Sequence, residues 1–141
     1  MGYREKIAWL ALIGMVIGYA PFFAALQHEA GAGGPTIGRF LILFAIASAV
    51  RVAIEIGGRI VVMVRLGREG REPPDERDRA IAARSASFAY IALLTGTIIV
   101  GVFMPFSSQG IAIVTAALFA IVVAELIRYL AIVLSYRLGW Q

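Results

Sequence analysis

The chain has 141 residues, of which 60% are hydrophobic and only 16% are charged, and its mean hydropathy is +0.85. Soluble domains are closer to half apolar and a quarter charged. So short a chain cannot bury this excess in a globule, because small domains have a high surface-to-volume ratio, and we expect lipid to cover the remainder. The absence of cysteine excludes disulfides, thiolate metal sites and a cysteine nucleophile.

Four apolar stretches predict four transmembrane helices, at about residues 7–26, 38–64, 84–106 and 110–134. Each approaches or exceeds the roughly 20 residues that a helix needs to cross the hydrocarbon core. Continuous apolar runs differ from the alternating pattern of barrel strands, so we expect an all-α polytopic membrane protein in which residues 1–141 form one four-helix domain. The first run is longer than the roughly 7–15 apolar residues of a signal peptide, and we expect it to be retained.

The basic residues predict the orientation. Arg4 and Lys6 precede the first span, residues 65–83 between the second and third spans carry several arginines, and Arg137 follows the fourth span. The other two connections, "QHEAGAGGPT" and "SSQG", contain no Lys or Arg. The positive-inside rule therefore places both termini and segment 65–83 on the cytoplasmic side of a bacterial cytoplasmic (inner) membrane. The charge of +4 follows this topology and alternates with acids, which favours contact with the lipid bilayer and argues against a nucleic-acid partner.

The two halves of the chain resemble one another. "AWLALIGMVIGYAPF" at 8–22 aligns with "AYIALLTGTIIVGVFMPF" at 89–106 with small gaps. Each is followed by a span that holds one acid near an arginine and ends Arg-Leu-Gly. A duplication would give a tandem repeat of two helical hairpins in the same orientation. Chance similarity between apolar segments explains the alignment equally well.

Apart from Arg39 and Arg84 at the span ends, five charged residues lie inside the predicted spans. Arg51, Glu55 and Arg59 are four residues apart and share one helical face, while Glu125 and Arg128 lie in the last span. A charge at mid-bilayer costs about 2.5–3.5 kcal/mol on insertion scales, so we expect these side chains to form a polar network that faces protein or water. The network either locks the helices together through salt bridges or binds a proton or substrate. The proximity of an arginine to each acid favours the first interpretation, because a paired carboxylate tends to stay ionised.

Four glycines predict close helix contacts. Gly14 and Gly18 have the small-xxx-small spacing of helix-packing motifs, and Gly57 and Gly58 lie beside the charged face of the second span. These contacts would form within the chain or between protomers of a homo-oligomer.

The longest polar stretch precedes the third span. Pro73-Pro74 ends the preceding element, Asp75 is a good helix N-cap, and an acid three residues later completes a capping-box pattern. The stretch is either the capped start of a long helix or a charged contact surface for a cytoplasmic or membrane protein partner. That contact segment would comprise Asp75, Glu76, Arg77, Asp78, Arg79 and Arg84.

The phrase "DERDRAI" followed by Ser and Ala-Tyr, within residues 75–90, resembles a signature of small four-span bacterial membrane proteins of unknown function. In that group an Asp-Glu-Arg-Asp-type run precedes the third span, and the proteins are often encoded beside helix-turn-helix regulators. The resemblance implies a four-span layout and no known activity, and it transfers no functional residue.

The sequence contains no nucleophile–base pair, no metal-ligand spacing and no phosphate-binding loop, and His28 beside Glu29 makes neither a metal site nor a catalytic dyad. We therefore expect neither an enzyme nor a cofactor. The sequence favours a small integral membrane protein that self-associates and acts as a non-enzymatic interaction or regulatory partner. The alternative is a small proton- or ion-coupled transporter that uses Glu55 and Glu125.

Overall fold

The protein is built from four long helices, seen in a computed structural model that describes residues 3–66, 73–108 and 110–139. The helices are α1 (Tyr3–Ala30), α2 (Ile37–Leu66), α3 (Glu76–Ile98) and α4 (Ile111–Leu138). All four are long and apolar enough to cross a membrane, α3 together with the turns that follow it, which confirms the all-α four-span prediction. The helices α1, α2 and α3 begin before the apolar runs that predicted them, and α4 begins one residue later than predicted. The helices α1, α2 and α4 end beyond their predicted spans.

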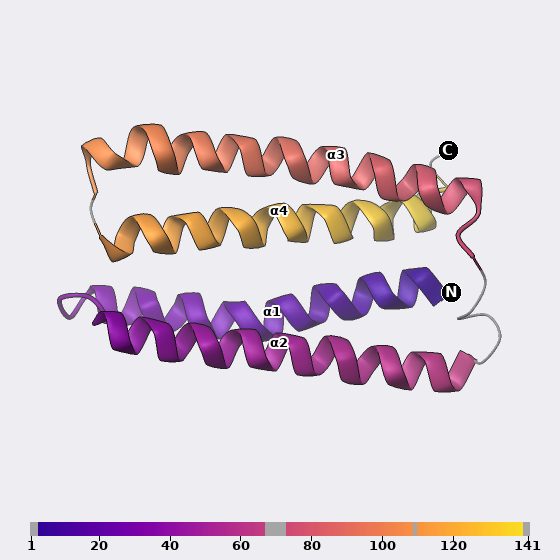
Figure 1. The fold of residues 1–141 in the computed structure, drawn as a ribbon, viewed down its shortest axis with the longest axis horizontal. Coiled ribbons are helices and arrows are strands. Elements are labelled where there is room, and N and C mark those ends of the chain that lie inside the picture. The colour runs from indigo at the N-terminus through magenta and orange to yellow at the C-terminus, as the bar shows by residue number, and fades with distance from the viewer. Residues whose placement is uncertain (1–2, 67–72, 109, 140–141) are drawn as a thin grey trace.

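The helices lie in the order α2–α1–α4–α3 across the molecule, and both termini are at the same end (Figure 1). The principal interfaces join α1 to α2, α3 to α4, and α1 to α4. Among the described residues α2 and α3 share no extended interface, so each covers a neighbour on one side only. Nearly half of the most apolar stretch of α1 is buried, whereas that of α3 has no buried residue. A single chain therefore leaves two edge helices largely uncovered.

The hydrophobic core follows α1. Phe22 is its centre in the half of the molecule away from the termini, with its ring 5.8 Å from Phe40 and 6.0 Å from Phe44, both in edge-on arrangements. Nearer the termini, Ala8 and Leu12 pack against Val133 of α4. The core thus ties α2 and α4 to opposite sides of α1.

The α-helical hydrogen-bonding pattern of α3 does not continue to the end of the third span. Ile99–Phe103 forms a π turn, in which the N–H of Met104 donates to the carbonyl of Ile99, and Met104–Phe106 forms a 3₁₀ turn. Pro105 lies in the 3₁₀ turn, where its missing N–H breaks the regular ladder. The irregular winding therefore lies at the end of the span, where the sequence places Pro105.

The chain folds as two antiparallel hairpins, α1–α2 and α3–α4. Their first helices occupy different positions, since α1 is an inner helix and α3 is at an edge (Figure 1). The duplication of the two halves stays a prediction.

Three of the four glycines lie where α1 and α2 approach closely. A Cβ atom at Gly18 would lie 3.0 Å from the Ala47 carbonyl oxygen, and one at Gly14 would lie 3.3 Å from the Ile54 side chain. Gly58 faces the end of the Leu10 side chain of α1. Gly57 differs, because the next residue along a helix points about 100° away, and nothing described lies within 4 Å of the place where its Cβ would be. Any packing role of Gly57 therefore requires a neighbour outside the single chain.

We predict that Gly18→Leu destabilises the protein, because the added side chain must push against the backbone of α2, and overpacking typically costs about 1–3 kcal/mol. Gly57→Leu is the matched control, since it adds the same group to open space. The measurement is the free energy of unfolding in mixed micelles. Equal stability of the two variants would show that α1 and α2 are not in close contact at Gly18.

Candidate functional site

The centre of the site is Arg51, which lies midway along α2. Its Nε donates to the Oε1 of Glu55 at 3.0 Å, one turn away on the same helix. Its terminal nitrogen lies 3.8 Å from the Oε2 of Glu125, which is midway along α4. One guanidinium therefore bridges two carboxylates on two different helices, across the inner helix α1.

Aromatic rings surround the arginines of this network. The guanidinium of Arg51 lies 5.7 Å from the ring centre of Tyr19, and that of Arg128 lies 5.8 Å from the ring centre of Tyr129. Arg128 also pairs with Glu125, with 3.9 Å between nitrogen and oxygen. Cation–π contacts add about 0.5–2 kcal/mol each and shield the cation from hydrocarbon. The four charged residues form a chain in the order Glu55, Arg51, Glu125, Arg128.

Exposure rises along this chain of charges. The side chains of Glu55 and Arg51 are 19% and 23% exposed, whereas those of Glu125 and Arg128 are 32% and 44% exposed. Glu125 and Arg128 also line a cavity of about 330 Å³ beside α3, with Ala89 and Leu93 on the opposite wall. The part of the network held by α2 and α1 is therefore better covered than the part on α4.

Arg59 does not belong to the network. It lies about 12 Å along α2 from Arg51, nearer the chain termini, at 1.5 Å per residue. Among the described residues it makes no ion pair, and it lines a different cavity of about 240 Å³ with Tyr129 and Arg4. The structure brings four of the five predicted intramembrane residues together and leaves Arg59 out.

The predicted contact segment is largely helical. Asp75 caps α3 by accepting from the backbone N–H of Asp78 at 2.6 Å, and the reciprocal bond from the Asp75 N–H completes the capping box, as its sequence pattern predicts. Asp78 is also bound by two other helices, since it accepts a hydrogen bond from the hydroxyl of Tyr136 and forms an ion pair with Arg4, whose Nε lies 2.8 Å away. Asp78 therefore joins α1, α3 and α4, and its carboxylate is not open to a partner.

The remaining members of the segment are exposed and make no ion pair with any other described residue. They are Glu76, Arg77, Arg79 and Arg84. They begin within the first turn of α3 and end about 12 Å along it, at 1.5 Å per residue. A contact surface at this end would therefore use their charges.

Sequence reasoning missed the polar contacts that close this end of the molecule. Buried Glu5 lies 3.4 Å from Arg137, whose guanidinium is 5.3 Å from the ring centre of Trp9. In the sequence, Arg4 and Arg137 indicate only the topology. Their ion pairs, with Asp78 and Glu5, join residues more than 70 positions apart. The one available signal was the predicted topology, which places the start of the first helix and the end of the last helix on the same side of the membrane.

The described residues contain no group of three or more His, Cys, Asp or Glu side chains that could hold a metal ion. His28 is exposed, and its neighbour Glu29 pairs with Arg39 at 3.0 Å at the other end of the molecule. The network near the middle of α2 and α4 consists of paired charges, in which the carboxylates of Glu55 and Glu125 alternate with the guanidinium groups of Arg51 and Arg128.

Searches against protein-family models, curated proteins and solved structures find no match for this chain.

We predict that Arg51→Gln destabilises the protein strongly, because it leaves Glu55 without its hydrogen-bonded partner and removes the link between α2 and α4. Breaking a buried ion pair by removing one partner typically costs about 3–5 kcal/mol, and the partial exposure here makes this an upper value. Arg39→Gln is the matched control, since it breaks an exposed pair worth about 0–1 kcal/mol. Both are measured as free energies of unfolding in micelles, and an Arg51 variant as stable as the Arg39 variant would contradict a structural role.

Proposed function

We propose that this chain is a self-associating, non-enzymatic interaction protein of the cytoplasmic membrane, with both termini and the contact segment on the cytoplasmic side. The orientation is supported by the basic residues, since Arg4, Arg65 and Arg137 lie at the end that holds both termini (Figure 1). The other end has Arg39 alone, close to Glu29.

The observation that carries the proposal is the exposure of Glu125 and Arg128 at mid-membrane depth. Ionised groups in the hydrocarbon core face protein or water, because lipid tails cannot solvate them. One chain covers Arg51 and Glu55 but leaves Arg128 44% exposed. A second protein surface over this part of α4 would complete the cover.

A second copy of the chain suits this position by charge. Glu125 and Arg128 are one turn apart on α4, so the exposed surface carries one acid and one base. In a two-fold symmetric pair the same surface meets itself, and the Arg128 of each copy can reach the Glu125 of the other. The wall from α3, with Ala89 and Leu93, is apolar and continues the same surface. The occupant we propose is therefore another protomer.

This second copy is testable by cross-linking, because the chain has no native cysteine. We predict that Leu93→Cys, on the cavity wall, cross-links two protomers through a short bis-thiol reagent in liposomes. Leu94→Cys is the matched control, since it is exposed at the same depth on α3 but points about 100° away, outside the cavity lining.

The result is scored as the fraction of covalent dimer at increasing dilution in lipid. Preferential cross-linking of the Leu93 variant that persists on dilution supports the proposal. Equal cross-linking of both variants, or a monomeric mass by light scattering in mild detergent, contradicts it.

Regulatory partnership is the second part of the proposal. The exposed charges of Glu76, Arg77, Arg79 and Arg84 lie on both sides of Asp78 in the first turns of α3. Because Asp78 contacts both α1 and α4, the start of α3 is anchored to the rest of the bundle, and we infer that these four charges form a surface for a soluble or membrane protein.

One observation favours transport as a second candidate, namely the cavity of about 330 Å³ that Glu125 lines. If the acids carry protons, Glu125→Gln and Glu55→Gln would abolish proton flux in proteoliposomes while the protein stays folded. We expect no flux above empty liposomes for the wild-type protein, because both acids are paired with Arg51. The measurement is the fluorescence of an enclosed pH dye under an imposed proton gradient, with circular dichroism as the check on folding. A wild-type flux that either variant removes would establish the transporter instead.

A further inference from the structure

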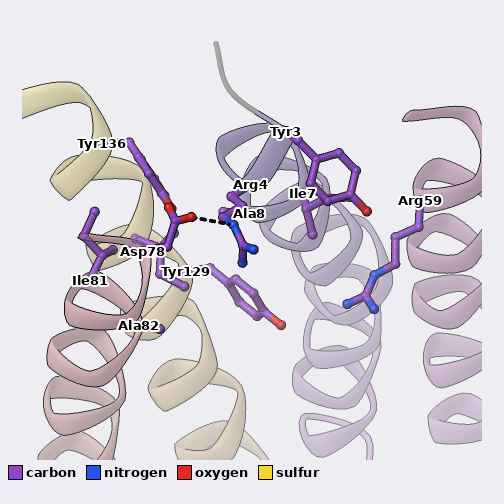
Figure 2. A pocket seen from close by; sticks show the side chains of 11 residues that line it. Tyr3, Arg4, Ile7, Ala8, Arg59, Asp78, Ile81, Ala82, Tyr129 and Tyr136 are labelled. Carbon is purple, nitrogen blue, oxygen red and sulfur yellow. Dashed lines mark hydrogen bonds and ion pairs between the residues drawn. The ribbon is translucent and has the colours of Figure 1, made fainter. Parts of the chain in front are cut away.

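A cavity of about 240 Å³ lies between the four helices at the end that holds both termini (Figure 2). Its walls include Arg4 of α1, Arg59 of α2, Asp78 of α3 and Tyr129 of α4. The volume far exceeds the roughly 10–15 Å³ that one water needs, and it is slightly below the roughly 300 Å³ at which pockets for drug-sized ligands begin. The space therefore suits a small ligand or the head of a larger one.

The cavity wall carries an excess of positive charge. Asp78 is its acid, and both oxygens of Asp78 are already engaged. One accepts a hydrogen bond from the hydroxyl of Tyr136, and the other forms an ion pair with Arg4, 2.8 Å from its Nε. Arg59 has no ion pair among the described residues. One carboxylate thus stands against two guanidinium groups, and the excess cation is Arg59.

Hydrogen-bond donors also exceed acceptors in the wall. Arg4 uses its Nε for Asp78, which leaves four N–H groups on its terminal nitrogens, and Arg59 contributes five. Tyr3 and Tyr129 add two hydroxyls to the wall, and Figure 2 shows Arg59 extending from α2 toward this space. Planar guanidinium groups bind phosphate oxygens in pairs, so two of them across a small cavity suit a phosphate better than a carboxamide or an alcohol.

The apolar part of the wall limits the ligand further. Ile7, Ile81 and Ile132 come from three helices and line the same space. A bare inorganic ion has no carbon atoms for these side chains to contact, whereas the carbon skeleton of a phosphate ester can pack against them. We propose that this cavity binds a phosphate ester anion, with Arg59 as its main charge partner and the isoleucines against its carbon skeleton.

Two sources could supply this chemistry, namely the headgroup of an anionic phospholipid and a soluble phosphate ester. The site lies at the level of the lipid headgroups if the basic residues mark the cytoplasmic interface. The proposal does not depend on self-association, because Glu125 and Arg128 do not line this cavity.

The test uses the full chain, purified without lipid in a maltoside detergent, which contains no phosphate. Native mass spectrometry and the unfolding temperature are recorded with phosphatidylglycerol, with diacylglycerol as the phosphate-free lipid, and with glycerol phosphate as the soluble ester. Binding and stabilisation by phosphatidylglycerol but not glycerol phosphate identify a lipid site. Stabilisation by glycerol phosphate identifies a soluble ligand. If neither raises the unfolding temperature more than diacylglycerol does, the proposal is overturned.

We predict that Arg59→Gln weakens binding of the active probe roughly ten- to hundredfold, since hydrogen bonds to charged groups are the strong ones. Arg59→Lys should retain part of the affinity, because it keeps the charge and loses the planar fork. Arg39→Gln is the matched control, as an exposed arginine at the other end of the molecule and outside the cavity lining, and it should bind like the wild type.

Equal affinity of Arg59→Gln and wild type would overturn the assignment of Arg59, as would equal weakening by Arg39→Gln. If Arg59→Gln does not fold, Tyr129→Phe replaces it, because that change removes one hydroxyl from the wall and keeps the ring beside Arg128. A Tyr129→Phe variant with wild-type affinity, together with an Arg59→Lys variant of wild-type affinity, would equally overturn the proposal.

Discussion

The pairing of charge inside an apolar medium is the constraint on which the rest of this structure depends. Arg51 is midway along a predominantly apolar helix, and its charge is compatible with lipid only if carboxylates meet it. Glu55 does so from one turn away on α2, and Glu125 does so from α4, on the other side of α1. Because α1 separates α2 from α4, the glycines at 14 and 18 matter to this pairing as well: they let α2 approach closely enough for Arg51 to reach α4.

The same constraint explains why the two halves of the molecule differ. The hairpin α1–α2 places Arg51 against the ring of Tyr19, and the side chains of Arg51 and Glu55 are the less exposed ones. The hairpin α3–α4 places Glu125 and Arg128 at a cavity wall beside an edge helix that has no buried residue in its most apolar stretch. A fold that covers half of its ion network suits a protein whose complete form contains more than one chain.

Hydropathy predicted the four helices and their approximate bounds because membrane insertion depends on properties that a single sequence carries, namely length and apolar content. The capping box at Asp75 was predictable for the same reason, since it acts over three residues. Contacts between distant residues were not. The four-residue spacing of Arg51, Glu55 and Arg59 predicted one shared face, yet Arg59 turns to a separate cavity, because its partners are set by where α4 and α1 lie and not by α2 alone. The bonds of Asp78 to Arg4 and Tyr136 left no local pattern at all.

The cavity and the ion network meet at Tyr129, whose ring lies beside Arg128 and which also lines the space that Arg59 enters. Their charges are nevertheless separate. The charges of the network cancel, since Glu55 and Glu125 pair with Arg51 and Arg128. The network therefore requires shielding from lipid and not a counter-ion. The cavity is unbalanced, because Asp78 is already bound by Arg4 and Tyr136 while Arg59 is unpaired among the described residues, so it needs an anion. A neutral protein surface can satisfy the first requirement and cannot satisfy the second, which is why the structure supports two different kinds of partner at two depths of the same helices.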